Sequence, residues 1–310
     1  MLIVGPGSIG RLLAGLWARS GLRVRLLART AKQEDALTRH GLRYTGPAGE
    51  RRIIRGLAAA RRGPRPSPSA AAFFCVKAAD LSAAIRAARP WLGPDAPAVA
   101  LQNGIGHARA FRRAFGRGRS VIGSCYAAAH ARGDGAVEHA GGRDIHLASD
   151  ADNAGAAALA AALLRRGGWR VRVVGDESRM LWTKLVTNAA VNFLGAASAA
   201  PNGELARDPA LRLVLDALVR EGVMVAKAAG HPPIGRPGEA VPRGCRAAGS
   251  QLNSMLVDLR RGRRTEVRAI AGPILAEARR RRVPAPTIAT LARVVERLER
   301  AALSRRRRSS

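Results

Sequence analysis

The chain has 310 residues, enough for two domains of ordinary size, and its hydrophobic fraction of 47% is that of a globular protein. No uninterrupted apolar run approaches the ~20 residues of a membrane-spanning helix, and the first motif follows Met1 without a secretory leader. We therefore expect a soluble, cytoplasmic protein. The three cysteines are far apart and odd in number, which argues against a disulfide framework or a zinc site, so we expect buried free thiols and no metal.

The charge is strongly basic, with 53 Lys and Arg against 22 Asp and Glu and a formal net charge of +31. Such a balance would ordinarily indicate nucleic acid or an anionic surface as the partner. Arginine is, however, spread through every segment beside an equally heavy load of alanine, as in a coding bias and not as in a binding patch. We expect a solvated basic surface, no specific nucleic-acid partner, and a basic disordered tail over residues 305–310.

The same bias makes lysine informative, because the chain has only Lys32, Lys77, Lys184 and Lys227. The pKa of a lysine can be lowered and the side chain can give up a proton, whereas arginine stays charged. Lys32 and Lys227 lie in polar or alanine-rich surroundings typical of a surface. Lys77 and Lys184 lie inside motifs and are the candidates for chemistry.

The chain opens with a short apolar strand over residues 2–4, a glycine turn and a helix over residues 11–19. The turn has the GxGxxG spacing of dinucleotide-binding sites, in which the glycines allow a tight turn, close approach to a pyrophosphate, and helix packing on the strand. A purely structural glycine turn is the alternative. The predicted cofactor-binding residues of the turn are Gly5, Gly7, Ser8, Ile9 and Gly10.

The second strand, over residues 23–28, lacks the acid that accepts from the ribose hydroxyls of NAD. Arg29 and Thr30 stand there instead, about 20 residues beyond the glycines, which favours the 2′-phosphate of NADPH as the group that is bound.

Two further apolar strands, over residues 71–76 and 98–101, run into Lys77 and into Gln102-Asn103. Alternation of strands and helices predicts a doubly wound parallel sheet of the Rossmann type, whose ligands bind beyond the carboxyl ends of the strands. Lys77 and Asn103 both follow such ends. Strand-like runs at 120–124, 144–147 and 171–174 complete the sheet with an antiparallel addition, so the first domain is expected over residues 1–175.

From residue 176 to residue 304 the pattern becomes helical, which predicts an all-helical second domain. Its first helix carries Lys184, Asn188 and Asn192 at a spacing of four, on one face of an otherwise apolar helix. Buried polar groups need partners, so this stripe predicts a wet cleft or a polar ligand. A solvent-exposed asparagine face is the alternative.

Taken together, these motifs resemble the ketopantoate reductase (2-dehydropantoate 2-reductase) family over nearly the whole chain. The matching segments are GPGSIG at 5–10, VK at 76–77, LQNGIG at 101–106, KLVTNAAVN at 184–192, PNGEL at 201–205, SMLVDLRRGRRTEV at 254–267 and VPAPT at 283–287. The resemblance implies a Rossmann domain, a helical domain, a cleft between them, and reduction of ketopantoate to pantoate by NADPH on the route to pantothenate and coenzyme A.

The resemblance also implies residue roles: Lys184 as general acid and carbonyl polariser, and Glu266 as a catalytic contact to the substrate hydroxyl region. The residues implied to bind the substrate are Lys77, Asn103, Lys184, Asn188, Asn192, Ser254 and Glu266. Lys77 and Asn103 are also implied to bind the cofactor. Without the resemblance, a partner for the dipole of a nearby helix start is the alternative role for Glu266.

The segment ahead of Ser254 departs most from the family pattern, since residues 235–246 are rich in Pro, Gly and Arg. Reduction of another 2-keto acid and a 3-hydroxyacid dehydrogenase activity therefore stay open. A nucleic-acid-binding protein on a Rossmann scaffold is disfavoured by the aromatic content of 4% and by the lack of a binding motif. Beyond the keto acid we expect no partner except a second copy of the chain.

Overall fold

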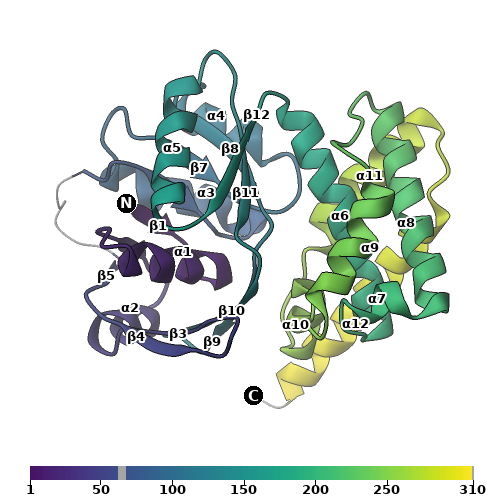
Figure 1. Ribbon diagram of the computed structural model, residues 1–310, viewed down its shortest axis with the longest axis horizontal. Helices are drawn as coiled ribbons and strands as arrows, with labels where there is room; N and C mark the ends of the chain where they lie inside the picture. The colour runs from purple at the N-terminus through teal and green to yellow at the C-terminus, as the bar shows by residue number, and fades with distance from the viewer. Residues whose placement is uncertain (62–67, 309–310) are drawn as a thin grey trace. The chain divides into compact units, whose positions relative to one another are not determined.

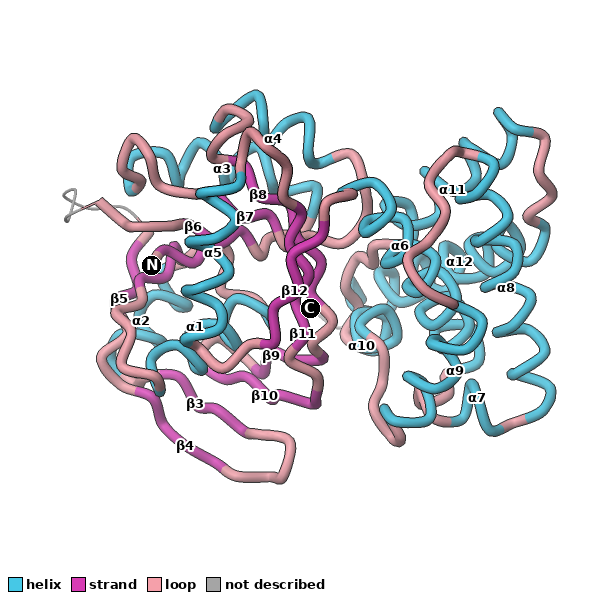
Figure 2. Tube along the Cα trace, turned by 45° about the horizontal axis from the view of Figure 1, so that its top comes forward, coloured by secondary structure: helices cyan, strands magenta, loops and turns pink. Residues whose placement is uncertain are grey.

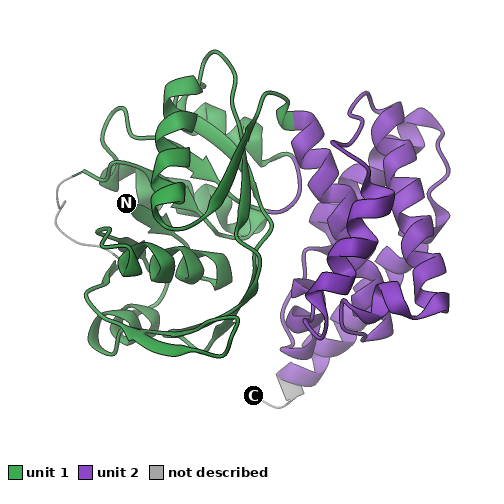
Figure 3. Cartoon of the chain, viewed as in Figure 1, with its two compact units in different colours: residues 1–102, 106–177 green, residues 103–105, 178–310 purple. Residues whose placement is uncertain are grey.

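The computed structural model describes residues 1–61 and 68–308 and divides into two compact units (Figure 3). The first comprises Met1–Gln102 and Gly106–Glu177, and the second comprises Asn103–Ile105 and Ser178–Ser310. The division thus falls two residues later than the boundary expected near residue 175. In addition, a three-residue loop that follows a strand of the first unit is part of the second.

The first unit is built on an eight-stranded sheet in the order β12-β11-β8-β7-β6-β1-β2-β5 (Figure 1). Every neighbouring pair is parallel except β8 and β11, which confirms the predicted Rossmann-type sheet with one antiparallel addition. The strands are β1 (Leu2–Val4), β2 (Arg25–Leu27), β5 (Ala58–Ala60), β6 (Ala72–Phe74), β7 (Ala98–Ala100), β8 (Ser120–Cys125), β11 (Asp144–Ala148) and β12 (Arg170–Val174).

Helices cover both faces of this sheet, as two consecutive residues of β6 illustrate. Side chains alternate along a strand, so Phe73 meets Trp17 with ring centroids 4.7 Å apart while Phe74 meets Phe111 on the other face at 5.0 Å. Trp17 also donates to the carbonyl of Leu163, which puts α1 and α5 on the same face. The helices are α1 (Ser8–Arg19), α2 (Ala31–Arg39), α3 (Leu81–Ala88), α4 (His107–Phe115) and α5 (Ala154–Arg166).

A second, four-stranded sheet packs on α1 and was not predicted. Its order is β4-β3-β10-β9, with β3 (Leu42–Thr45), β4 (Arg51–Ile54), β9 (Ala128–Arg132) and β10 (Ala136–Gly141). Arg11 of α1 is 2% exposed and donates to the carbonyls of Gly133 and Ala136 at 2.7 and 2.9 Å. Arg11 is therefore a buried side chain that joins α1 to this sheet.

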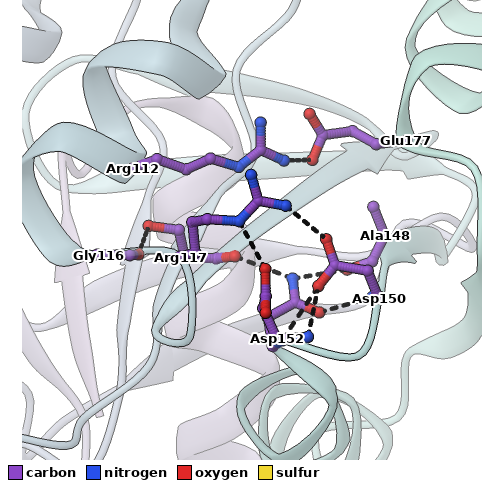
Figure 4. A network of polar contacts seen from close by, with 9 residues as sticks. Arg112, Gly116, Arg117, Ala148, Asp150, Asp152 and Glu177 are labelled. Carbon is purple, nitrogen blue, oxygen red and sulfur yellow. Dashed lines mark hydrogen bonds and ion pairs between the residues drawn. The ribbon is translucent and has the colours of Figure 1, made fainter.

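An ion-pair network joins the ends of three elements of the first unit (Figure 4). Arg117, just after α4, pairs with Asp152 at 2.6 Å and with Asp150 at 3.8 Å, and Arg112 pairs with Glu177. The Arg117 pairs are exposed and stabilise little, whereas Arg112 and Glu177 are partly buried. Burial raises the pKa of Glu177 and Arg112 opposes that rise. Glu177 begins α6, so the network fixes the end of the first unit.

The second unit contains only helices among its described residues (Figure 2). They are α6 (Glu177–Ser198), α7 (Glu204–Arg207), α8 (Pro209–Ala228), α9 (Pro237–Ala248), α10 (Ser254–Arg260), α11 (Val267–Arg281) and α12 (Pro286–Arg308). Helix α6 is buried on most of its surface. It meets α8 closely, because a Cβ on Gly222 would lie 3.1 Å from Val186. This confirms the predicted helical region.

The prediction of a disordered tail from residue 305 is wrong for residues 305–308, because α12 continues through Arg308. Arginine is a good helix former, and cations in a last turn complement the helix dipole, so the basic run extends the helix. Ser309 and Ser310, which complete the expected tail, lie outside the described residues.

All three cysteines are free thiols; Cys125 and Cys245 are buried as predicted, whereas Cys75 is only half-buried. In residues 1–61 and 68–308, no helix is long and apolar enough to cross a membrane, and no group of His, Cys, Asp and Glu could hold a metal ion.

Candidate active site

The glycine turn between β1 and α1 has the geometry that a dinucleotide requires. Gly5 has φ +90°, and a Cβ there would lie 2.5 Å from a methyl of Val76. A Cβ on Gly10 would lie 2.3 Å from the Gly5 carbonyl, whereas nothing lies within 4 Å of the position that a Cβ on Gly7 would take. The first and third glycines are thus required by packing, and the second leaves the backbone open to a ligand at the helix N-terminus.

Neighbouring side chains hold this turn in place. Arg11 Nε and Gln33 Nε2 both donate to the carbonyl of Pro6, at 2.8 and 3.1 Å. Ser8, the first residue of α1, accepts at Oγ from the N–H of Ala131 at 3.0 Å. The first turn of α1 carries no acidic residue, so its dipole is available to a phosphate. Ile9, also predicted for the cofactor, is half-buried in this turn.

Arg29 follows β2 and is 82% exposed, in a 3.7 Å ion pair with Asp80. Its backbone N–H donates to Gln33 Oε1, and Thr30 caps α2 by accepting from the N–H of Gln33 at 3.2 Å. Gln33 therefore ties the end of β2 to the glycine turn, a role that nothing in the sequence pattern singled out. Lys77 is exposed in the same unit, just beyond β6.

Three of the predicted substrate-site residues form one hydrogen-bonded chain within the second unit. Asn188 Nδ2 donates to Asn103 Oδ1 at 3.2 Å, and Asn103 Nδ2 donates to Glu266 Oε2 at 2.9 Å. The amide of Asn103 thus accepts from one neighbour and donates to the other. Asn188 is only 8% exposed, so its amide depends on this partner. The chain joins α6, the residue 103–105 loop and the start of α11.

Lys184 and Asn192 lie on α6, one turn before and one turn after Asn188. Residues four apart share a helix face, so the half-buried Lys184 side chain is a neighbour of the amide that leads to Glu266. Asn192 is 6% exposed. The polar stripe is therefore largely buried, and the solvent-exposed alternative does not hold for Asn188 and Asn192.

Glu266 precedes α11, but its side chain makes no capping hydrogen bond to that helix. The carboxylate is directed to Asn103 instead, so the simple role of a helix-dipole partner does not describe it.

Ser254 is exposed at the first position of α10, a helix capped by Asn253, which accepts at Oδ1 from the N–H of Leu256 at 2.9 Å. Ser254 shares the unit of Glu266, and Lys77, Arg29 and the glycines share the other.

Models of known protein families match both units of the chain. The family model for ketopantoate reductase PanE/ApbA matches residues 1–151, and the model for its C-terminal region matches residues 177–299. The chain belongs to the ketopantoate reductase family. Among curated relatives of this reductase, it is 32% identical over 303 residues to the 2-dehydropantoate 2-reductase of Halobacterium salinarum, covering 95% of this chain and 97% of the relative. The enzyme of the same name from Archaeoglobus fulgidus is 31% identical, covering 88% of each.

Solved structures share the fold of this chain. A PanE/ApbA family ketopantoate reductase from Ralstonia eutropha is 27% identical with a TM-score of 0.82, covering 97% of this chain and 98% of the other. A D-mandelate dehydrogenase solved with NADH and anilino(oxo)acetate has a TM-score of 0.86 over the same shares at 22% identity, which is a likeness of fold alone. The chain is therefore an oxidoreductase of the 2-dehydropantoate 2-reductase family.

Proposed function

We propose that the protein reduces 2-dehydropantoate to pantoate with NADPH, in the cytoplasm, on the route to pantothenate and coenzyme A. The observation that carries the proposal is the chain from Asn188 through Asn103 to Glu266, with Lys184 one turn away on α6. A cation and a carboxylate held near one amide relay suit a substrate that has both a carbonyl to be protonated and a hydroxyl to be recognised.

The residues proposed to bind the pyrophosphate and the 2′-phosphate of the cofactor lie in the first unit. The open backbone at Gly7 and the N-terminus of α1 fit a pyrophosphate, and Gly5, Gly10, Ser8 and Ile9 shape that turn. Arg29 would hold the 2′-phosphate, because it is exposed and its 3.7 Å ion pair with Asp80 is a weak surface contact. NADPH, when bound, supplies the hydride.

The residues of the chain then have distinct tasks. As negative charge develops on the keto oxygen during reduction, the Lys184 ammonium would stabilise that charge and would give up its proton to the oxygen. Glu266 accepts from the substrate hydroxyl, and Asn103, which bonds Glu266, fixes the direction of that carboxylate. Asn188, Asn192, Ser254 and Lys77 orient the remaining polar groups.

A second candidate is reduction of a different 2-keto acid. It is favoured by the likeness in fold to the D-mandelate dehydrogenase and by the unusual composition of residues 235–246, which are rich in Pro, Gly and Arg and place Pro242 inside α9. NADH as the cofactor is the corresponding alternative to NADPH, since that dehydrogenase was solved with NADH.

One assay tests both candidates. NADPH oxidation is followed with 2-dehydropantoate, with the same acid lacking its hydroxyl, and with a phenyl-bearing 2-keto acid, and each is repeated with NADH. We expect kcat/KM to be highest for 2-dehydropantoate with NADPH, by at least tenfold over the acid without the hydroxyl, because Glu266 would lose its partner. A higher kcat/KM with the phenyl-bearing acid would overturn the proposal in favour of the second candidate.

A further inference from the structure

Two donors of Thr265, the residue immediately before Glu266, converge on one oxygen of Glu299. The Thr265 backbone N–H and its Oγ1 hydroxyl donate to Glu299 Oε2 at 2.5 and 2.6 Å. Both side chains are half-buried. Hydrogen bonds to an ionised acceptor are about twice as strong as neutral ones, so this pair holds Thr265 firmly on α12.

The same threonine also fixes the residue on the other side of Glu266. Val267 donates its N–H to Thr265 Oγ1 at 3.3 Å, so the hydroxyl accepts from Val267 while it donates to Glu299. Glu266 thus lies between Thr265, which bonds the Glu299 carboxylate, and Val267, which bonds the Thr265 hydroxyl. Its own side chain makes no cap, and its direction toward Asn103 follows from the backbone that Glu299 holds.

Helix α12 is a rigid support for this contact. At its start, Glu221 of α8 accepts from the N–H groups of Thr287 and Ile288 at 2.9 Å each. Val295, one turn before Glu299, is fully buried in the core of the second unit. A carboxylate on a helix anchored in this way has little freedom to follow a shift of the loop before α11.

We propose that Glu299 is a positioning residue for the reduction, which acts through Thr265 to hold the Glu266 carboxylate in its productive direction. This inference rests on the proposed function, because it requires Glu266 to take part in the reaction. Glu296, one turn earlier on the same helix, is the matched comparison: it pairs with Arg268, which is 82% exposed, and such surface pairs contribute little.

The test is a double-mutant cycle in steady-state and single-turnover kinetics. We expect Glu299→Ala to lower kcat ~10- to 100-fold, the loss of one or two charge-assisted hydrogen bonds, with a small change in the KM for NADPH. Glu299→Gln keeps an acceptor oxygen and should lose less. Thr265→Ser keeps both donors and should retain most activity, and Glu296→Gln should match the unmodified enzyme.

The decisive arm repeats Glu299→Ala in a Glu266→Gln background. If Glu299 acts through Glu266, its removal should then change kcat by less than about threefold, because coupled residues are not additive. An equal loss in both backgrounds, or an unchanged kcat in Glu299→Ala, overturns the proposal. Should Glu299→Ala fail to fold, Glu299→Gln and Thr265→Val take its place, each measured alone and in the Glu266→Gln background.

A second readout separates this inference from the proposed function. Amide hydrogen exchange at Thr265, Glu266 and Val267 should accelerate at least tenfold in Glu299→Ala and stay unchanged in Glu296→Gln. Unchanged exchange in Glu299→Ala refutes the support by Glu299 whatever the substrate. Faster exchange in an enzyme that leaves 2-dehydropantoate unreduced refutes the proposed substrate and supports the link to the Glu266 backbone, and the cycle is then run with the accepted acid of the panel.

Discussion

Gly195, in the last turn of α6, makes room for the buried amide of Asn253, which caps the helix that begins at Ser254. A Cβ at position 195 would lie 2.2 Å from Asn253 Nδ2, far inside contact distance. Asn253 is 5% exposed and caps α10 through Oδ1, while Nδ2 has no hydrogen-bond partner among the described residues. Gly195→Ala must therefore displace the cap of the helix that begins at Ser254.

Opposing effects determine how far Gly195→Ala changes the free energy of unfolding. Alanine in place of glycine inside a helix stabilises by roughly 1 kcal/mol. Overpacking costs about 1–3 kcal/mol, and loss of an asparagine cap costs about 1 kcal/mol. The net expectation for Gly195→Ala is a destabilisation of about 1–3 kcal/mol, with a raised KM for the keto acid because Ser254 loses its support. Gly272→Ala in α11 is the matched control, since nothing lies within 4 Å of its added methyl.

A compensating change gives the reasoning a sharp test by thermal melting and keto-acid kinetics. Asn253→Ser keeps a capping oxygen on a shorter side chain and removes the buried amide donor that has no partner. The double variant Gly195→Ala/Asn253→Ser should melt at or above the unmodified temperature and recover the KM. If the two changes are simply additive, the clash with Asn253 is not what destabilises Gly195→Ala.

The remaining predictions concern the chemistry, the cofactor and pH. Lys184→Ala should fold and bind NADPH but lose ~10²–10⁴ in single-turnover hydride transfer, and Lys184→Arg should restore little; transfer near the unmodified rate would make Lys184 structural. Arg29→Ala should raise the KM for NADPH much more than that for NADH, and equal use of both cofactors by the unmodified enzyme would contradict this. Burial lowers the pKa of His107 from 6.5 to about 4, so the unfolded chain takes up its proton first and stability is lost as pH falls from 6.5 toward 4. Denaturant titrations at pH 7 and pH 5 should show His107→Leu avoiding about 2 kcal/mol of that loss, and identical pH dependence of both proteins would refute it.

The fold was predictable where the signal is local. The glycine turn, the apolar strands after it and the antiparallel addition at β11 all follow from short sequence patterns. The four-stranded sheet was not, because β3 pairs with β10 across more than 90 residues. LRYT alternates over only four residues, and AVEHAG shows no clean alternation of apolar and polar residues. When two short strands pair across so long a stretch of sequence, neither strand contains a local pattern that identifies its partner.

Residue types in the site were predictable, but their partners were not. Scarcity singled out Lys184, and spacing put Asn188 and Asn192 on its face of α6. The bond from Asn103 to Glu266 joins residues 163 apart, and only tertiary structure provides it. The residue 103–105 loop belongs to the second unit although it follows a strand of the first, and Gly104, at φ +87°, lies so close that a Cβ would be 3.0 Å from the carbonyl of Ala269.

The scarcity that makes lysine informative applies to acids as well, and sequence reasoning did not use it. With 22 acids among 53 basic residues, a carboxylate at the surface readily finds an arginine, as Glu296 finds Arg268. Glu221, Glu266 and Glu299 accept instead from uncharged donors: helix amides, the amide of Asn103, and Thr265. Two of these contacts act in sequence: Glu221 holds the start of α12, and Glu299 on α12 holds Thr265, the residue before Glu266. An acid that bonds neutral groups in so basic a protein is held there by the surrounding fold, which makes it a better guide to the site than any cluster of arginines.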